Sequence, residues 1–107
     1  MIWTLDDIVN WHVKTFPNVD LKSQKLKFLE EYREYLESGD IMELADMGIV
    51  YLVLSQRFNC DIFVDVMLDE QSKIKNLTEL DNAVCKKMDI NAKRKWIYKD
   101  GVYRHED

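Results

Sequence analysis

The sequence is poor in glycine and proline, with three Gly and one Pro in 107 residues. So few turn-forming residues favour helices and argue against an all-β fold. There is no glycine-rich phosphate-binding loop, and no Ser or Cys stands beside a His in a pattern typical of nucleophilic catalysis. The two cysteines, Cys60 and Cys85, lack metal-type spacing, so we expect reduced thiols in a cytoplasmic protein.

A long apolar run, a signal peptide and an excess of basic residues are also missing. The apolar stretch at 41–54 is too short and too rich in acids to span a bilayer. A net charge of −5 argues against a nucleic-acid scaffold. The length suits one domain over residues 1–107. We therefore expect partners other than membranes and nucleic acids.

Carboxylates are abundant where the chain is expected to fold back on itself. Glu30, Glu31 and Glu34 precede Gly39, which suits a helix end, and Asp40 suits the cap of the next helix. Such an arrangement predicts two antiparallel helices joined by a short turn. Counted outward from Gly39, the acids then fall at matching heights in two pairs: Glu34 with Glu43, and Glu31 with Asp46.

The second of these helices is predicted to be buried, because nearly every residue from 41 to 54 is apolar. Its only acids after the cap are Glu43 and Asp46, and no basic residue appears before Arg57. Burying unpaired carboxylates is costly unless a hard divalent cation binds them. The alternative is an ordinary solvated face on the Glu-rich first helix. We expect a metal site with four ligands: Glu31, Glu34, Glu43 and Asp46.

All-oxygen ligation favours Mg²⁺, for which Mn²⁺ is a usual substitute. The two histidines, His12 and His105, are not spaced to form ligand pairs with these acids. Their positions argue against zinc and against a di-iron carboxylate bundle. Glu30 is the candidate for holding the attacking water or a second metal ion.

Further side chains suit the remaining parts of a nucleotide. Phosphate contacts are expected from Lys27, Lys87, Asn91 and Arg94, although basic side chains of this kind are usually only solvated. A nucleobase can stack on an aromatic face, and the candidates are Trp11 with His12, or Trp96. The alternative for each Trp is simple packing in the core.

Capping and breaking signals place five helices at about 5–15, 21–38, 41–58, 62–74 and 79–94. The fourth is expected to be capped by Asp61 and the fifth by Thr78. The second helix is expected to bury a stripe formed by Leu26, Leu29, Tyr32 and Leu36. Asp-Gly at 100–101 predicts a hairpin across residues 97–104. The predicted fold class is all-α: a bundle of four to five helices around the acidic helical hairpin, with a small C-terminal hairpin.

Residues 30–34 (EEYRE) followed by residues 43–46 (ELAD) resemble the EExxE and ExxD segments of MazG-like all-α nucleoside triphosphate pyrophosphohydrolases. Residues 11–17 (WHVKTFP) are similar to the WHxxTFP entry of one subgroup, found in bacteriophages and bacteria. Residues 87–96 and 100–105 resemble the KMxINxxRxW and DGxYxH ending of that subgroup. Two departures are a short gap between Glu34 and Glu43 and a longer segment at 61–77.

This resemblance implies Mg²⁺-dependent cleavage of a nucleoside triphosphate between its α and β phosphates, giving monophosphate and pyrophosphate. The subgroup implies dATP and dGTP as substrates, whereas other relatives take dUTP or several nucleotides. It also implies a homodimer or a homotetramer. In this mechanism the catalytic acids are Glu30, Glu31 and Glu34, and basic side chains stabilise the departing pyrophosphate.

Two rival hypotheses stay open from the sequence. The first is a non-enzymatic helical interaction module whose acids bind a basic partner. The second is a hydrolase-like protein that keeps only some of the ligands, with regulation in place of turnover.

Overall fold

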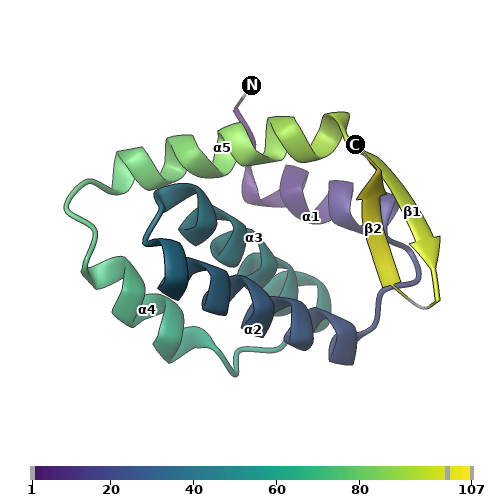
Figure 1. Ribbon diagram of the computed structural model, residues 1–107, viewed down its shortest axis with the longest axis horizontal. Coiled ribbons are helices and arrows are strands. Elements are labelled where there is room, and N and C mark those ends of the chain that lie inside the picture. Colours follow the sequence, from purple (N-terminus) through teal and green to yellow (C-terminus); the bar gives the residue numbers. More distant parts are fainter. Residues whose placement is uncertain (1, 101, 107) are drawn as a thin grey trace.

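The computed structural model describes residues 2–100 and 102–106. These form five helices, α1 (Leu5–Thr15), α2 (Leu21–Ser38), α3 (Ile41–Phe58), α4 (Val64–Ser72) and α5 (Leu77–Lys93), and two strands, β1 (Lys95–Lys99) and β2 (Val102–Glu106). The predicted all-α fold with a small C-terminal hairpin is confirmed. In Figure 1 the hairpin lies at one end of the bundle, near the end of α1 and the start of α2, with α4 at the opposite end. Among the described residues, no helix combines the length and apolar composition that a membrane crossing needs.

Helix α3 is the centre of the bundle, since α1, α2, α4 and α5 all contact it. Its inward residues include Leu44, Met47, Val53 and Leu54, each fully shielded from solvent. An apolar helix placed among four others buries most of its surface, as its composition predicts. The acids that α3 carries are therefore positioned beside the core.

The turn between α2 and α3 forms as its sequence predicts. Gly39 adopts a left-handed conformation with φ of 66°, which closes α2 without the strain that a side chain would add. The Asp40 carboxylate accepts a hydrogen bond from the Met42 amide at 2.9 Å and caps α3. At the other end of α2, the Asp20 carboxylate accepts from the Ser23 amide at 2.8 Å. These caps fix the register of the acids on the two helices.

The predicted core stripe of α2 is wrong at three of its four positions, since only Tyr32 packs against the core. Leu26, Leu29 and Leu36 are exposed at 57%, 49% and 62%. The buried row is instead Gln24, Phe28 and Glu31, with Tyr35 partly buried behind it. The Phe28 ring stacks on Phe63 with centroids 4.2 Å apart, which fixes this face of α2 against the core. Two rows of α2 carry apolar side chains, and the row that turns inward is the one that also carries polar groups.

The starts of the last two helices also differ from the predictions. Asp61 does not cap α4, which begins at Val64 with no side-chain hydrogen bond at its cap. Stacking of Phe63 on Phe28 holds the chain in a turn just before that helix. Helix α5 begins two residues earlier than Thr78 implies, because the Asn76 side chain accepts from the Thr78 amide at 3.0 Å. Asn is a stronger cap than Thr, so the earlier start is favoured.

The C-terminal hairpin is longer than the predicted span of 97–104, since β1 and β2 pair from Lys95↔Glu106 to Lys99↔Val102. Asp100 has φ of 54°, and Gly101 of the predicted turn lies outside the described residues. A two-stranded sheet needs support from the rest of the protein. Phe16 provides it, because its ring contacts Trp96 at 5.0 Å and Tyr103 at 4.8 Å between centroids. The Tyr103 hydroxyl also accepts a hydrogen bond from the Asn18 amide at 3.2 Å.

Candidate metal centre and adjoining cavity

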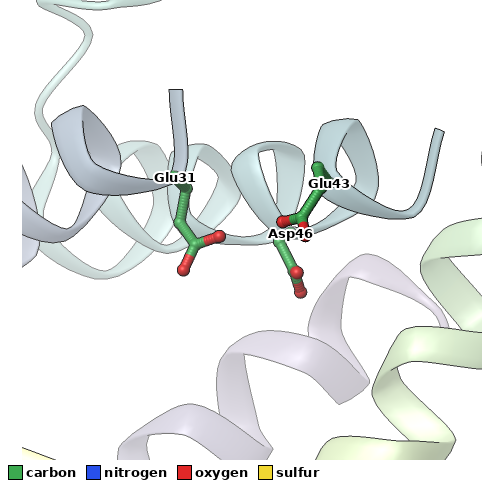
Figure 2. A group of neighbouring side chains, drawn as sticks. All are labelled: Glu31, Glu43 and Asp46. Carbon is green, nitrogen blue, oxygen red and sulfur yellow. The ribbon is translucent and has the colours of Figure 1, made fainter. Parts of the chain in front are cut away.

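Three carboxylates from two helices converge beside the core. Glu31 on α2 and Glu43 and Asp46 on α3 each offer an oxygen that lies within 4.8 Å of the others. Figure 2 shows the three side chains extending from the two helices into the same space. The Gly39 turn and the two caps place them there, as counting outward from the turn predicts. Three of the four expected metal ligands are therefore brought together.

Glu34, the fourth expected ligand, is not in that group within the described part of the chain. It lies three residues beyond Glu31, which rotates its side chain about 60° around the helix. Glu34 still lines the same cavity, as does Glu30. Burial raises the pKa of Glu34, and the neighbouring Glu31 and Glu43 raise it further. The charges of the cluster therefore affect the pKa of Glu34, although its side chain lies at the edge of the group.

Glu31 has an oxygen whose hydrogen-bonding capacity is unused. The residue is 6% exposed, and its Oε2 atom is buried without a hydrogen-bond partner among the described residues. Its other oxygen lies 3.0 Å from the Lys27 ammonium group. Buried polar atoms in folded proteins almost always have partners, so an unpartnered carboxylate oxygen needs an explanation. A bound cation is one ligand that would satisfy it.

The pKa of Asp46 lies well above the ordinary value for an aspartate. Burial raises its pKa to about 6, the Lys87 charge opposes this, and Glu31 and Glu43 add to it. Lys87 Nζ lies 3.1 Å from Asp46 Oδ2, and both side chains are only 17% exposed. At this end of the cavity five carboxylates, including Glu30 and Glu34, face two lysines. A local negative excess remains, which suits a divalent cation.

Three of the four expected phosphate contacts lie in sequence along one wall of the cavity. Lys87 and Asn91 lie about one turn apart on α5, Arg94 is the residue that caps its C-terminus, and all three line the cavity. Lys87 is the member beside the acids, whereas Arg94 stands near β1. The Arg94 guanidinium also approaches the Asn91 side-chain oxygen, at 3.4 Å. Lys27 and Lys87 each form an ion pair with a carboxylate of the cluster.

The cavity itself has a volume of about 550 Å³, within the usual range for small-molecule sites. Its far end is aromatic: Trp11 contacts Phe16 and Trp96 edge to face, at 5.3 Å and 6.4 Å between centroids. The Trp96 indole donates a hydrogen bond to the Asn91 carbonyl at 3.0 Å, which fixes that ring. The cavity thus joins an acidic end to an aromatic end, and the expected base contacts lie at the latter.

His12 lines this aromatic end and is 7% exposed. Its Nδ1 atom lies 2.8 Å from Nη1 of Arg57, and that guanidinium also donates to the Phe16 carbonyl at 3.0 Å. A guanidinium can only donate, so Nδ1 accepts and the proton of the neutral ring stays on Nε2. Burial and the Arg57 charge lower the pKa of His12 to about 3. His12 is therefore a neutral donor and not a phosphate-binding cation.

Several cavity residues were not singled out from the sequence. Phe16 and Tyr103 belong to segments that carry the family resemblance but had no role assigned to them. Arg57 does not line the cavity but contacts His12 and Phe16, which do, and in the sequence it is marked only as the first basic residue after the apolar run. Gln24, which is 4% exposed, could have been found as a polar residue one turn before Phe28 on the buried row.

Comparisons with known proteins add no family assignment. No family model matches the chain, and searches of curated proteins and of solved structures each found no match. The MazG-like resemblance of residues 30–34 and 43–46 therefore stays a proposal.

Proposed function

We propose that the protein is a MazG-like, Mg²⁺-dependent hydrolase that converts a nucleoside triphosphate to its monophosphate and pyrophosphate. The observation that carries this proposal is the buried Oε2 of Glu31, which has no hydrogen-bond partner among the described residues and lies beside Glu43 and Asp46 at one end of a cavity. Leaving such an atom unsatisfied costs on the order of 1–3 kcal/mol. A cation bound by the three carboxylates removes that cost.

The donor set fits the proposed metal ion. Glu31, Glu43 and Asp46 supply only carboxylate oxygens, the ligands that Mg²⁺ and Mn²⁺ prefer. Glu34 stands at the edge of the group, where it can bind a second ion or an exchangeable water. When bound, Mg²⁺ supplies Lewis-acid polarisation of the phosphate oxygens.

The two lysines of the acidic end have a second role in this proposal. Lys27 and Lys87 form ion pairs with Glu31 and Asp46. A cation held by these carboxylates would satisfy their charge and leave the two ammonium groups available for phosphate oxygens. Asn91 and Arg94 extend the same wall and suit the rest of the triphosphate.

The reaction is a single displacement at the α-phosphorus. A water oxygen attacks that phosphorus, and the bond to the oxygen that bridges to the β-phosphorus breaks. The departing pyrophosphate takes the bonding electron pair, and Lys27, Lys87 and Arg94 stabilise its charge. Glu30, exposed at the cavity wall beside the cluster, orients the water and accepts its proton.

For the substrate we propose dATP or dGTP, with dUTP or broad specificity as the alternatives. The aromatic end of the cavity supports a base-containing substrate, because Trp11 and Trp96 present ring surfaces there. No feature of the acidic end distinguishes one nucleotide from another, so base choice has to arise among the residues at the aromatic end.

The test is incubation of the protein with each deoxynucleoside triphosphate and Mg²⁺, with phosphorus NMR of the products. We expect a monophosphate and pyrophosphate in equal amounts. Release of orthophosphate instead would contradict the proposed bond. Calorimetry with Mn²⁺ separates the rival interaction module, which predicts no specific metal binding.

We also propose that the active form is a homodimer or homotetramer. The exposed side chains of α2 that follow a 4-3-4-3 spacing are Lys22, Leu26, Leu29, Arg33 and Leu36. That spacing is the seam of paired helices, and three of its five positions are leucine. A second copy of the same helix can cover this row without disturbing the cavity, because none of the five residues lines it.

A further inference from the structure

Gln24 is a second buried polar group whose hydrogen-bonding capacity is unused. It is 4% exposed and lines the cavity, yet within residues 2–100 and 102–106 its side-chain amide has no hydrogen-bond partner. Neither amide atom is sealed from the cavity, since Glu31 Oε2 is the one fully enclosed side-chain atom without a partner in that same part of the chain. The amide therefore pairs with whatever occupies the cavity, water or a ligand, and is available to a ligand without breaking a hydrogen bond within the described part of the protein.

The position of Gln24 relative to the acids decides which part of a ligand it meets. Gln24 and Glu31 lie on the same buried row of α2, seven residues apart. Seven residues are about two helical turns, or roughly 10 Å along the helix axis. A nucleotide whose phosphates bind at the acidic end therefore extends its sugar and base towards Gln24.

The surroundings of Gln24 fit a flat heterocycle. The same cavity is lined by Trp11, Phe16, Trp96 and Tyr103, whose rings offer apolar surface and edges. His12 adds one further polar atom, because Arg57 occupies Nδ1 and leaves the Nε2 proton as a donor. Polar groups in such a site are few, and each therefore has a large effect on specificity.

We propose that Gln24 reads the hydrogen-bonding edge of the nucleobase, with His12 as an accompanying donor, in the site that the proposed function assigns to a nucleoside triphosphate. The primary amide donates through its nitrogen and accepts through its oxygen, so it pairs with an adjacent acceptor and donor such as those of adenine. Gln24 is thus a specificity-determining residue, distinct from the carboxylates and lysines that hold the phosphates.

The discriminating experiment is Gln24→Glu, assayed well above neutral pH so that the new carboxyl group is ionised. A carboxylate only accepts hydrogen bonds, and guanine is the one common base with two adjacent donors on its edge. The ratio of kcat/KM for dGTP to that for dATP should rise by about tenfold or more relative to the unaltered protein. The matched control is Gln56→Glu, the same change at an exposed position of α3 outside the cavity, which should leave the ratio unchanged.

A second variant, Gln24→Leu, removes both hydrogen bonds without adding charge. It should lower kcat/KM for deoxynucleoside triphosphates by about tenfold. Inhibition by inorganic tripolyphosphate should stay unchanged, because that ligand has phosphates and no base. Equal weakening of tripolyphosphate and nucleotides, or an unaltered base ratio in Gln24→Glu, overturns the assignment.

A separate measurement tests base binding by Gln24 if the proposed hydrolysis is not observed. If the unaltered protein hydrolyses no nucleotide, base reading is measured directly by adding deoxyadenosine and following the side-chain amide resonances of Gln24 by NMR. A shift of these resonances, absent from those of Gln56, supports the nucleobase subsite independently of any hydrolysis. Resonances that do not move overturn it.

Discussion

Lys87 on α5 and Asp46 on α3 form an ion pair, with Nζ and Oδ2 separated by 3.1 Å and both side chains largely buried. The pair joins the acidic cluster to the wall that carries Asn91 and Arg94. Even with this lysine beside it, burial keeps the pKa of Asp46 at about 6. Protons and metal ions therefore compete for the same carboxylate near neutral pH.

The first prediction concerns this competition. Above the Asp46 pKa of about 6 the carboxylate is ionised and free to bind a cation, whereas below it a proton has to be displaced first. Mn²⁺ affinity should therefore fall by about fivefold on going from about pH 6 to about pH 5. Calorimetric titration with Mn²⁺ at several pH values measures this. Asp46→Asn should bind Mn²⁺ more weakly and with less pH dependence, and a flat profile in the unaltered protein would contradict the prediction.

The second prediction concerns Glu31, whose Oε2 has no hydrogen-bond partner among residues 2–100 and 102–106. Glu31→Gln keeps the shape and removes the charge, so metal binding and pyrophosphate release should fall by about 100-fold or more. The fold should survive, because no hydrogen bond to Oε2 is lost. Thermal unfolding with and without Mn²⁺ checks both points: the unaltered protein is stabilised by the ion and the variant is not.

A matched control for that experiment is Glu37→Gln, the same substitution on the exposed side of α2. It should change neither Mn²⁺ binding nor turnover. Undiminished activity in Glu31→Gln would mean that the cluster is not the metal site.

The acidic helical hairpin could be predicted from sequence because its determinants are local. Gly39 and Asp40 set the turn by backbone conformation and capping, and the helical repeat then fixes where Glu31, Glu43 and Asp46 lie. The inward face of α2 could not be predicted in the same way. Its two candidate rows are both partly apolar, and stacking of Phe28 on Phe63, far along the chain, decides between them.

The roles of the residues at the aromatic end of the cavity could not be predicted from local sequence patterns either. Arg57 reaches His12 and Phe16 across more than forty residues of sequence, and this contact sets the tautomer and charge of His12. Gln24 acquires its significance only because its row is buried and no described residue pairs with its amide. Local patterns place helices and acids, whereas contacts between distant segments determine which polar groups are left unsatisfied.

The third prediction concerns His12, whose pKa is lowered to about 3 by burial and by Arg57. Between about pH 3 and about pH 6.5 the unfolded chain binds a proton at this residue that the folded protein does not. The free energy of unfolding should therefore rise with pH across this window, by about 1.4 kcal/mol per unit from this group. Denaturant unfolding at about pH 4.5, 5.5 and 6.5 measures the slope.

The variant that isolates this contribution is His12→Asn, whose side-chain oxygen can replace Nδ1 as the acceptor for Arg57 but does not titrate. In this variant the free energy of unfolding should rise less steeply with pH, by about 1.4 kcal/mol per pH unit, which is the contribution of one proton. Nitrogen NMR of the imidazole should also show an unprotonated Nδ1 down to about pH 4. An equal slope in both proteins, or a protonated Nδ1, would refute the neutral assignment.

The fourth prediction concerns the exposed leucine row of α2, where Leu26, Leu29 and Leu36 are each about half exposed or more. If a second copy covers this row, Leu29→Lys places a charge in the seam and should convert the assembly to monomers while helicity is unchanged. Sedimentation velocity and circular dichroism measure these two properties. Leu68→Lys, at a position of α4 that is 59% exposed, is the matched control and should leave the assembly intact. An unaltered protein that sediments as a monomer at high concentration would show instead that this row faces solvent, and the site would then be complete within one chain.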